Sequence, residues 1–383
     1  MLRKLVPYIL LVLCLSCVIS CKQDPSRPWI GTYFENRAPG ELPSLVQYAQ
    51  GFDIYHWDGI TKLVIYHPTN SGLPGGEYYL ANSEVTGRFR DTAHMITLPL
   101  RDVAVFSSTQ LSAFIKLGEL EKVKGISEAG YITDPDVRKL LQKGSINELA
   151  GSGHFFIEKT LEVNPGLIFI SPYNLEEQHA LELTGIPLIP FFDFFETDPL
   201  GRAEWIRFTA AFCGKEEQAD SIFGRTVDNY KSYAQLAGQV IEKPTVFSDK
   251  YFNGQWFIPG GQSYIARLFA DAGADYLWKE DTHKASFPLD YESVFERAHD
   301  ADFWRIIGSY GDVATYESLA AENELYRHFK AFRERKVIYC DAEQTAYFEN
   351  SPLEPDVVLA DLIRAFHPEL LPDYKPKYYH RLP

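Results

Sequence analysis

The pattern of apolar and polar positions changes several times along the chain. Segments 52–55 and 61–67 alternate apolar and polar residues, as half-buried strands do, and a turn rich in Gly, Pro and Asn follows at 68–76. From about residue 101 onward, short apolar segments of strand length are interspersed with helical stretches. This arrangement indicates βα units around a mainly parallel sheet, and therefore an α/β fold.

The βα pattern occurs twice and is interrupted between the two occurrences. In the first region the expected strands are 103–106, 123–126, 167–170 and 187–191, and the expected helices are 110–117, 136–141, 157–163 and 175–183. In the second region the expected strands are 245–247, 303–307 and 337–339, and the expected helices are 265–272, 294–298 and 357–366. Each region is long enough for one three-layer α/β lobe.

Between the two regions, residues 199–242 contain no strand signal and place apolar residues at helical spacing, with Gly214 as a possible interruption. A helix of about 40 residues would be about 60 Å long and could cross from one lobe to the other. The predicted organisation is an N-terminal β-rich segment with its tether at 22–100, a lobe at 101–198, a linking helix at 199–242 and a second lobe at 243–383.

The N-terminus has the features of a secretory signal. Arg3 and Lys4 precede an apolar segment, 5–15, that is too short to span a bilayer comfortably. The following sequence Val-Ile-Ser-Cys, which ends at Cys21, is similar to a lipobox. We therefore expect residues 1–21 to be a lipoprotein signal peptide, Cys21 to be acylated, and the protein to be anchored by lipid at the periplasmic face of a bacterial membrane. An uncleaved anchor helix or a plain cleavable signal are the alternatives.

Composition narrows the possible functions. The net charge is −15, which argues against binding to nucleic acid phosphates. Of five cysteines, only Cys213 and Cys340 lie in the expected folded part, and their spacing does not require a disulfide. The ten His residues are scattered without a metal-ligand spacing, and no nucleophile elbow, zinc protease motif, phosphate loop or dinucleotide fingerprint is present. We expect no catalytic residues, no protein-bound metal and no resident cofactor.

Three segments in order along the chain resemble a known family. They are 197–206 (TDPLGRAEWI), 255–268 (QWFIPGGQSYIARL) and 367–372 (HPELLP). Together they are similar to the helical-hinge (class III) substrate-binding proteins of ABC importers for iron-siderophore, haem or cobalamin, and to a lipoprotein subgroup of that class. The resemblance covers residues 48–383 and implies two α/β lobes joined by one long rigid helix.

The resemblance also implies a function. It predicts a monomeric binding protein that captures an iron chelate, either a siderophore complex or haem, and delivers it to a permease dimer with ATPase subunits. A cobalamin-binding protein of the same class is one alternative. A tetrapyrrole metal chelatase-like enzyme, which also has two α/β lobes, is the alternative from another class, and a surface binder without a transport role is a third.

Two glutamates are expected to contact the permease, because the family presents one carboxylate from each lobe to arginines of that partner. The matching positions are Glu158, in the sequence FIEKTLE, and Glu292, in the sequence DYESVFE. A glutamate in the first turn of a helix is also favoured by the helix dipole alone.

The ligand should bind between the lobes, where the carboxyl ends of the parallel strands meet. Aromatic side chains there could stack on a flat conjugated ring, although core packing is the alternative for each of them. The residues nominated by position are Ser108, Thr109, Tyr131, Tyr173, Asp193, Trp256, Tyr264, Tyr310 and Tyr347.

Overall fold

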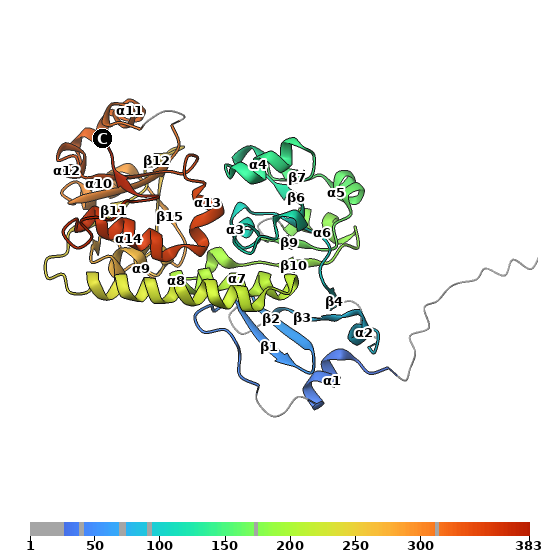
Figure 1. Cartoon of the computed structure of the whole chain (residues 1–383). Coiled ribbons are helices and arrows are strands. Elements are labelled where there is room, and N and C mark those ends of the chain that lie inside the picture. Colours follow the sequence, from blue (N-terminus) through green and yellow to red (C-terminus); the bar gives the residue numbers. More distant parts are fainter. Residues whose placement is uncertain (1–26, 38–41, 69–73, 90–93, 172–174, 311–313) are drawn as a thin grey trace, which may run out of the picture.

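The computed structural model of the chain describes residues 27–37, 42–68, 74–89, 94–171, 175–310 and 314–383. Two α/β lobes lie side by side along a pair of helices, α7 (Pro199–Cys213) and α8 (Glu216–Ala237), and a smaller module lies on the other side of these helices (Figure 1). The two-lobed α/β fold with mainly parallel sheets confirms the prediction from the sequence. None of the helices in the described ranges is both long enough and apolar enough to span a bilayer.

The N-terminal module, residues 27–98, is built around a four-stranded sheet. The sheet has the order β1-β2-β3-β4, and only the β3–β4 pair is parallel. One face of the sheet packs on α1, and the other contributes residues to the core that contains Trp205 and Phe208 of α7. The elements are α1 Ile30–Arg37, β1 Phe52–Trp57, β2 Ile60–Tyr66, β3 Pro74–Asn82, α2 Ser83–Thr86 and β4 Met95–Leu98.

The N-terminal lobe contains a six-stranded sheet of order β10-β9-β5-β6-β7-β8, parallel except for the β7–β8 hairpin. Its strands are β5 Val103–Val105, β6 Val123–Ser127, β7 Asn147–Gly151, β8 His154–Phe155, β9 Ile168–Ile170 and β10 Leu188–Pro190. Its helices are α3 Ser108–Lys116, α4 Pro135–Gln142, α5 Ile157–Val163 and α6 Leu175–Glu182.

The C-terminal lobe has a sheet of order β14-β11-β16-β17-β18 and a small antiparallel sheet of order β12-β13-β15. Its strands are β11 Thr245–Ser248, β12 Tyr251–Phe252, β13 Gln255–Ile258, β14 Asp275–Tyr276, β15 Phe287–Leu289, β16 Phe303–Gly308, β17 Val337–Asp341 and β18 His380–Arg381. Its helices are α9 Tyr264–Asp271, α10 Tyr291–Ala298, α11 Tyr316–Glu322, α12 Lys330–Arg333, α13 Tyr347–Asn350 and α14 Pro355–Phe366.

The linking segment differs from the single helix expected over 199–242. Helix α7 (Pro199–Cys213) ends at Gly214, which has a left-handed φ of 66°, and α8 (Glu216–Ala237) folds back along it. An ion pair of 2.8 Å between Arg207 Nε and Asp220 Oδ1 joins the two helices across this turn. Only α8 crosses between the lobes, over about 33 Å for its 22 residues.

Two buried carboxylates hold the loop before β1 against α7. Glu204 is fully buried, and its oxygens accept hydrogen bonds from the backbone N–H groups of Gln47, Tyr48 and Ala49 at 2.7–3.1 Å. Arg207 Nη1 donates to the same carboxylate at 2.8 Å. The N-terminal module is therefore fixed on the linking helices by charge-assisted hydrogen bonds as well as by apolar packing.

The second carboxylate, that of Glu196, accepts from the backbone N–H groups of Gln50 and Gly51, each at 2.9 Å, and from the Trp205 indole at 3.0 Å. Burial raises the pKa of Glu196, and these hydrogen bonds oppose the rise. A Cβ atom on Gly51 would lie 2.8 Å from the Trp205 ring, so the close approach requires glycine.

The two cysteines of the folded part are both buried free thiols. Cys213 belongs to the core of the N-terminal lobe and Cys340 to the core of the C-terminal lobe. Burial raises the pKa of each thiol to about 12. They do not pair with each other.

Replacing Glu204 with Ala should destabilise the protein strongly, because three backbone N–H groups and Arg207 would lose their shared acceptor. We expect a loss of roughly 3–5 kcal/mol in the free energy of unfolding, measured by urea denaturation followed by circular dichroism. Glu217→Ala, at an exposed position of α8, is the control and should change stability by less than about 1 kcal/mol. Equal stabilities of the two variants would contradict the role assigned to Glu204.

Candidate functional site: a pocket at the inter-lobe end of the N-terminal sheet

A pocket of about 470 Å³ lies where strands β5, β6, β7 and β9 of the N-terminal lobe end. This is the edge of a parallel sheet at which α/β proteins bind ligands. Its volume falls within the usual range of small-molecule sites. The residues that line it are Phe106, Ser107, Ser108, Ser127, Glu128, Tyr131, Ile132, Ala150, Gly153, His154, Phe155, Ile170 and Ser171.

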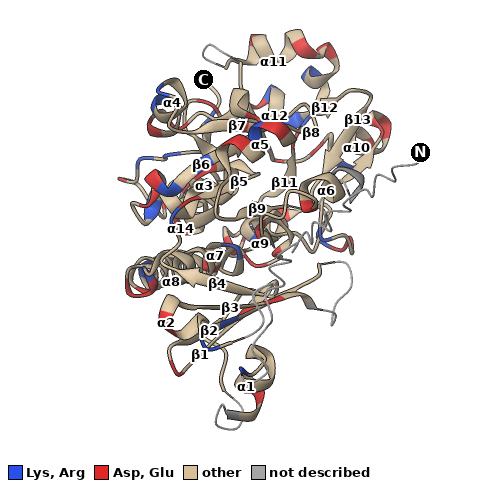
Figure 2. Cartoon of the chain, turned by 90° about the vertical axis from the view of Figure 1, so that its right-hand side faces the viewer, with Lys and Arg blue, Asp and Glu red and all other residues tan. Residues whose placement is uncertain are grey.

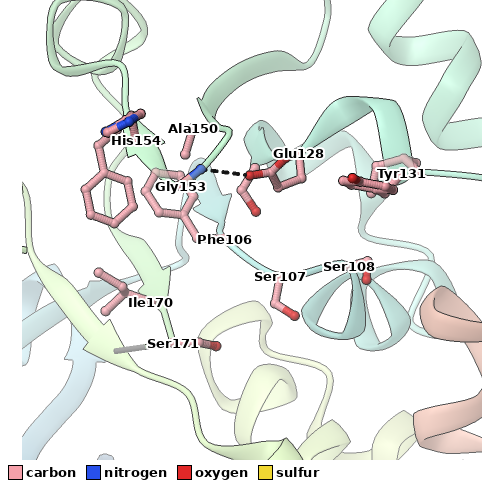
Figure 3. Close-up of a pocket in the computed structure, with 13 residues that line it drawn as sticks. Phe106, Ser107, Ser108, Glu128, Tyr131, Ala150, Gly153, His154, Ile170 and Ser171 are labelled. Atoms are coloured by element: carbon pink, nitrogen blue, oxygen red, sulfur yellow. Dashed lines mark hydrogen bonds between the residues drawn. The ribbon is translucent and has the colours of Figure 1, made fainter. Parts of the chain in front are cut away.

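The polar part of the pocket is formed by the start of α3. The Ser107 side chain caps this helix by accepting from the Thr109 N–H, which places Ser107 and Ser108 side by side at the pocket (Figure 3). The Gln110 side chain accepts from the Phe106 N–H at 2.9 Å and donates to Ser171 Oγ at 3.1 Å. The strand ends are thereby held in fixed positions beneath the pocket.

Aromatic side chains form the apolar part of the pocket. The Phe106 and Phe155 rings stack with their centroids 5.3 Å apart. Tyr131 is 78% exposed, which is unusual for such a large side chain, and lies at the opposite side of the pocket from His154 (Figure 3). Partly buried stacked rings with an exposed tyrosine and a few hydroxyl groups suit a ligand that is flat and largely apolar.

Glu128 gives the pocket a carboxylate. Its backbone has a left-handed φ of 50°, which is costly for a residue other than Gly and persists only where the surroundings require it. One carboxylate oxygen accepts from the Gly153 N–H at 3.3 Å (Figure 3). Its position directly after β6 could have identified Glu128 from the sequence.

A buried ion pair lies beside α3. Asp193 is 2% exposed; it accepts from Thr109 Oγ1 at 3.2 Å and from Arg202 Nε at 3.3 Å. Burial raises the pKa of Asp193, although Arg202 and Thr109 oppose this. Arg202 also lies 4.7 Å from the centre of the Tyr264 ring. Thr109, Asp193 and Tyr264 are therefore close together in the structure, but they do not line the pocket. Their contacts with Arg202 and with one another hold α3 and α9 against α7.

A second group of predicted and neighbouring residues lies in the C-terminal lobe, just after the ends of β11 and β16. Lys250 Nζ lies 4.7 Å from the centre of the Tyr310 ring and pairs with Glu322 at 2.6 Å. Tyr347 was also expected in the ligand site, but it is only 3% exposed and its hydroxyl accepts from that of Tyr379 at 3.1 Å. Of these two predicted tyrosines, the structure leaves Tyr310 the more accessible.

The expectation for Trp256 was wrong. Its side chain is fully buried in the core of the C-terminal lobe, and its indole N–H donates to the Ser248 carbonyl at 2.9 Å. The reason is alternation along β13, which turns Trp256 and Ile258 inward and leaves Phe257 44% exposed. Tyr173 and Cys21 lie outside the described residues.

The lobes touch next to the pocket through Glu349 of α13. Its carboxylate is 1% exposed and accepts from the backbone N–H of Thr133 at 2.6 Å and from the Thr133 hydroxyl at 3.2 Å. Its backbone carbonyl accepts from Ser112 Oγ of α3 at 2.6 Å. These bonds join residues more than 200 positions apart and set the spacing of the two lobes on one side of the cleft.

The glutamates expected at the permease occupy equivalent places in the two lobes. Glu158 and Glu292 are each the second residue of a helix, α5 or α10, and both are exposed. In each lobe one residue separates this helix from the antiparallel strand before it, β8 or β15. Four residues, 164–167 or 299–302, then lead to the next strand, β9 or β16. Helices α5 and α10 lie on the outer flanks of their lobes (Figure 1).

The sequence profile of the periplasmic binding protein family matches residues 103–344. This range includes most of both lobes and the linking helices, so the chain belongs to the periplasmic binding protein family, as the resemblance predicted. The N-terminal module lies outside the match. No group of three or more His, Cys, Asp or Glu residues suited to a metal ion occurs within the described ranges.

Relatives and solved structures agree with this assignment. The chain is 27% identical over 366 residues to the uncharacterized lipoprotein MJ0878 of Methanocaldococcus jannaschii, covering 88% of this chain and 85% of the relative. It shares its fold with a periplasmic heme-binding protein from Pseudomonas aeruginosa (TM-score 0.58, 17% identity, 74% of this chain and 98% of that one). It is also similar to the heme-binding protein RhuT from Roseiflexus sp. RS-1 (TM-score 0.56, 19% identity, covering 71% of this chain and 99% of that one).

Removing the Glu349 carboxylate should loosen the contact between the lobes. In Glu349→Ala the Thr133 amide loses its acceptor, at a cost of about 1–3 kcal/mol. We therefore expect amide hydrogen exchange around residues 133–138 to accelerate by a factor of about 5–100. Glu343→Ala is the control, because its ion pair with Arg138 is about half exposed and surface pairs contribute little. Unchanged exchange in Glu349→Ala would rule out this role.

Proposed function

We propose that this chain is the substrate-binding lipoprotein of an ABC importer and that it captures an iron chelate, either a siderophore complex or haem, for delivery to the permease. The observation that carries the proposal is the pocket at the strand ends of the N-terminal lobe, in a chain that belongs to the periplasmic binding protein family. Transport proteins of this kind bind their cargo without changing it, so no catalytic residue is required.

The lining of the pocket supports a flat, conjugated cargo. Phe106 and Phe155 offer stacked rings, Tyr131 is exposed beside them, and Ser107 and Ser108 offer hydroxyl groups. Two proteins with this fold are described as heme-binding. A cobalamin presents a similar flat ring and is the alternative cargo within the same class.

The permease contact is proposed for Glu158 and Glu292. Each carboxylate is exposed in the first turn of a helix, where a partner can reach it. Their equivalent places in the two lobes suit a partner with two equivalent halves, such as a permease dimer with its ATPase subunits. A protein of similar fold from Listeria monocytogenes is described as an ABC transporter substrate-binding protein (TM-score 0.54).

A lipid anchor at Cys21 completes the proposal. Two relatives are described as lipoproteins, and the family name places its members outside the cytoplasmic membrane. Acylation would keep a monomeric binding protein close to the membrane, because each buried methylene contributes about 0.8 kcal/mol.

A titration tests the cargo. The soluble form that starts at residue 22 should bind one member of a panel of haemin, cobalamin, cobinamide and ferric siderophores, with one-to-one quenching of tryptophan fluorescence. Tyr131→Ala should weaken that binding roughly two- to tenfold, since a ring contact contributes about 0.5–1.5 kcal/mol. Ile241→Ala, at a position 95% exposed and outside this pocket, is the control. Flat titrations with every compound would contradict the proposed cargo.

Uptake of the bound chelate by cells tests the docking residues. Glu158→Gln and Glu292→Gln should each lower uptake by about tenfold or more, because close charge pairs at interfaces couple by roughly 1.5–7 kcal/mol. Chelate affinity should not change. Glu296→Gln, at an exposed position of the same helix as Glu292, should take up the chelate normally. Normal uptake with both docking variants would exclude this docking mode.

A further inference from the structure

The position of the N-terminal module bears on how the protein is oriented at a membrane. Both views place α1 at one end of the molecule, and α4 and α11 at the other end, with α7 and α8 between them (Figures 1 and 2). The pocket and the docking helices α5 and α10 lie on the side of α7 and α8 away from α1 (Figure 1). The chain enters the folded protein through α1.

The chain between the proposed anchor and α1 is short. Eight residues, 22–29, separate Cys21 from Ile30, and even a fully extended chain of that length spans only about 30 Å. A folded protein of this size is about 50–55 Å across, as estimated from its expected radius of gyration. The tether therefore cannot pass around the molecule to bring the lobes toward the anchoring bilayer.

The surface beside the tether suits the interface of a bilayer. Trp29 immediately precedes α1 and is 49% exposed. One turn further along, the Tyr33 ring lies 5.8 Å from the Trp57 ring and 5.0 Å from the Phe89 ring. Trp and Tyr side chains are favoured where lipid meets water, because each combines an apolar ring with a polar group.

The module is also rigidly attached to the rest of the protein. Glu196 and Glu204 fix the loop before β1 on α7, and the sheet packs on the aromatic core of the N-terminal lobe. An orientation imposed on α1 is therefore transmitted to both lobes through α7 and α8.

From these observations we propose that the N-terminal module is the membrane-facing end of the anchored protein, with Trp29 at the lipid–water interface and the two lobes directed away from the anchoring bilayer. The inference rests on acylation of Cys21, as in the proposed function. In this orientation α5 and α10 face away from the anchoring bilayer, so the permease that docks on them lies in a different bilayer from the anchor.

Energy transfer from the protein to lipid tests this orientation. The acylated full-length chain is reconstituted into vesicles of phosphatidylethanolamine and phosphatidylglycerol that contain an acceptor dye in the headgroup region. A donor fluorophore is placed at one of two exposed positions, Asn36→Cys on α1 or Glu317→Cys on α11. The native thiols Cys213 and Cys340 are buried. We expect several-fold stronger transfer from position 36 than from position 317, and equal or reversed transfer would overturn the proposal.

Two further variants separate the possible causes of a negative result. With brominated lipids, part of the tryptophan fluorescence should be quenched in the native chain and not in Trp29→Ser, while chelate binding is the same in both. Quenching that is identical in the two chains would overturn the role of Trp29.

Cys21→Ser should lose energy transfer at both labelled positions and keep chelate binding. If the native chain itself shows no transfer and incorporates no labelled fatty acid, the anchor is absent and the orientation is overturned, while the titration still decides the cargo.

Discussion

The burial of helix α7 is the constraint on which the arrangement of the molecule depends. Every residue of this helix except Arg207 is buried, although a surface helix normally exposes one face. Trp205, Phe208 and Phe212 pack into the N-terminal lobe, and Leu200 packs into the C-terminal lobe. The buried carboxylate of Glu204 accepts hydrogen bonds from backbone N–H groups of the loop before β1. One helix is therefore shared by three parts of the protein, and none of them can move far without breaking its contacts.

The cleft follows from this arrangement. Because α7 and α8 hold the two parallel sheets on one side, the carboxyl ends of the strands from both lobes are directed into the space between them. Glu349 then closes one side of that space by accepting from the Thr133 amide of the opposite lobe. The pocket at the ends of β5, β6, β7 and β9 lies beside this contact. The residues that line it all belong to the N-terminal lobe.

Hydrophobic periodicity located most of the elements. The helix expected at 157–163 is α5, and the strand expected at 123–126 is β6 with one more residue. Periodicity did not reveal the hairpin of α7 and α8, because α7 is buried on nearly all sides and its sequence gives no single exposed face from which to detect a reversal. Gly214 was visible as an interruption, but a single glycine does not distinguish a kink from a turn. Short edge strands such as β8 and β12 have too few residues for an alternation of apolar and polar positions to be detected.

The residues that line the pocket were predicted less completely than the helices and strands. Ser108 and Tyr131 were nominated as ligand contacts by their positions after strand ends, and both line the pocket. Which face of an element turns into the core depends on the elements packed against it, so Trp256 on β13 and Tyr347 on α13, which are both buried, were placed wrongly in the ligand site. Glu158 and Glu292 were assigned from the resemblance to the family, and the structure gives both the same place between an antiparallel strand and the next parallel strand.

The charges around the cleft indicate what kind of cargo the protein can hold. Lys250 pairs with Glu322, Arg202 with Asp193, Arg305 with Asp249, and Arg138 with Glu343. Each basic group named here is matched by a carboxylate, and Glu128 adds a negative charge to the pocket itself. Among the described residues that line the pocket there is no Lys or Arg, so a multiply charged anion such as a triscatecholate complex would bind beside Glu128 without a basic partner, at a cost that grows with its charge. For the cargo that we propose, the electrostatics favour a chelate of low net charge that stacks on Phe106, Phe155 and Tyr131.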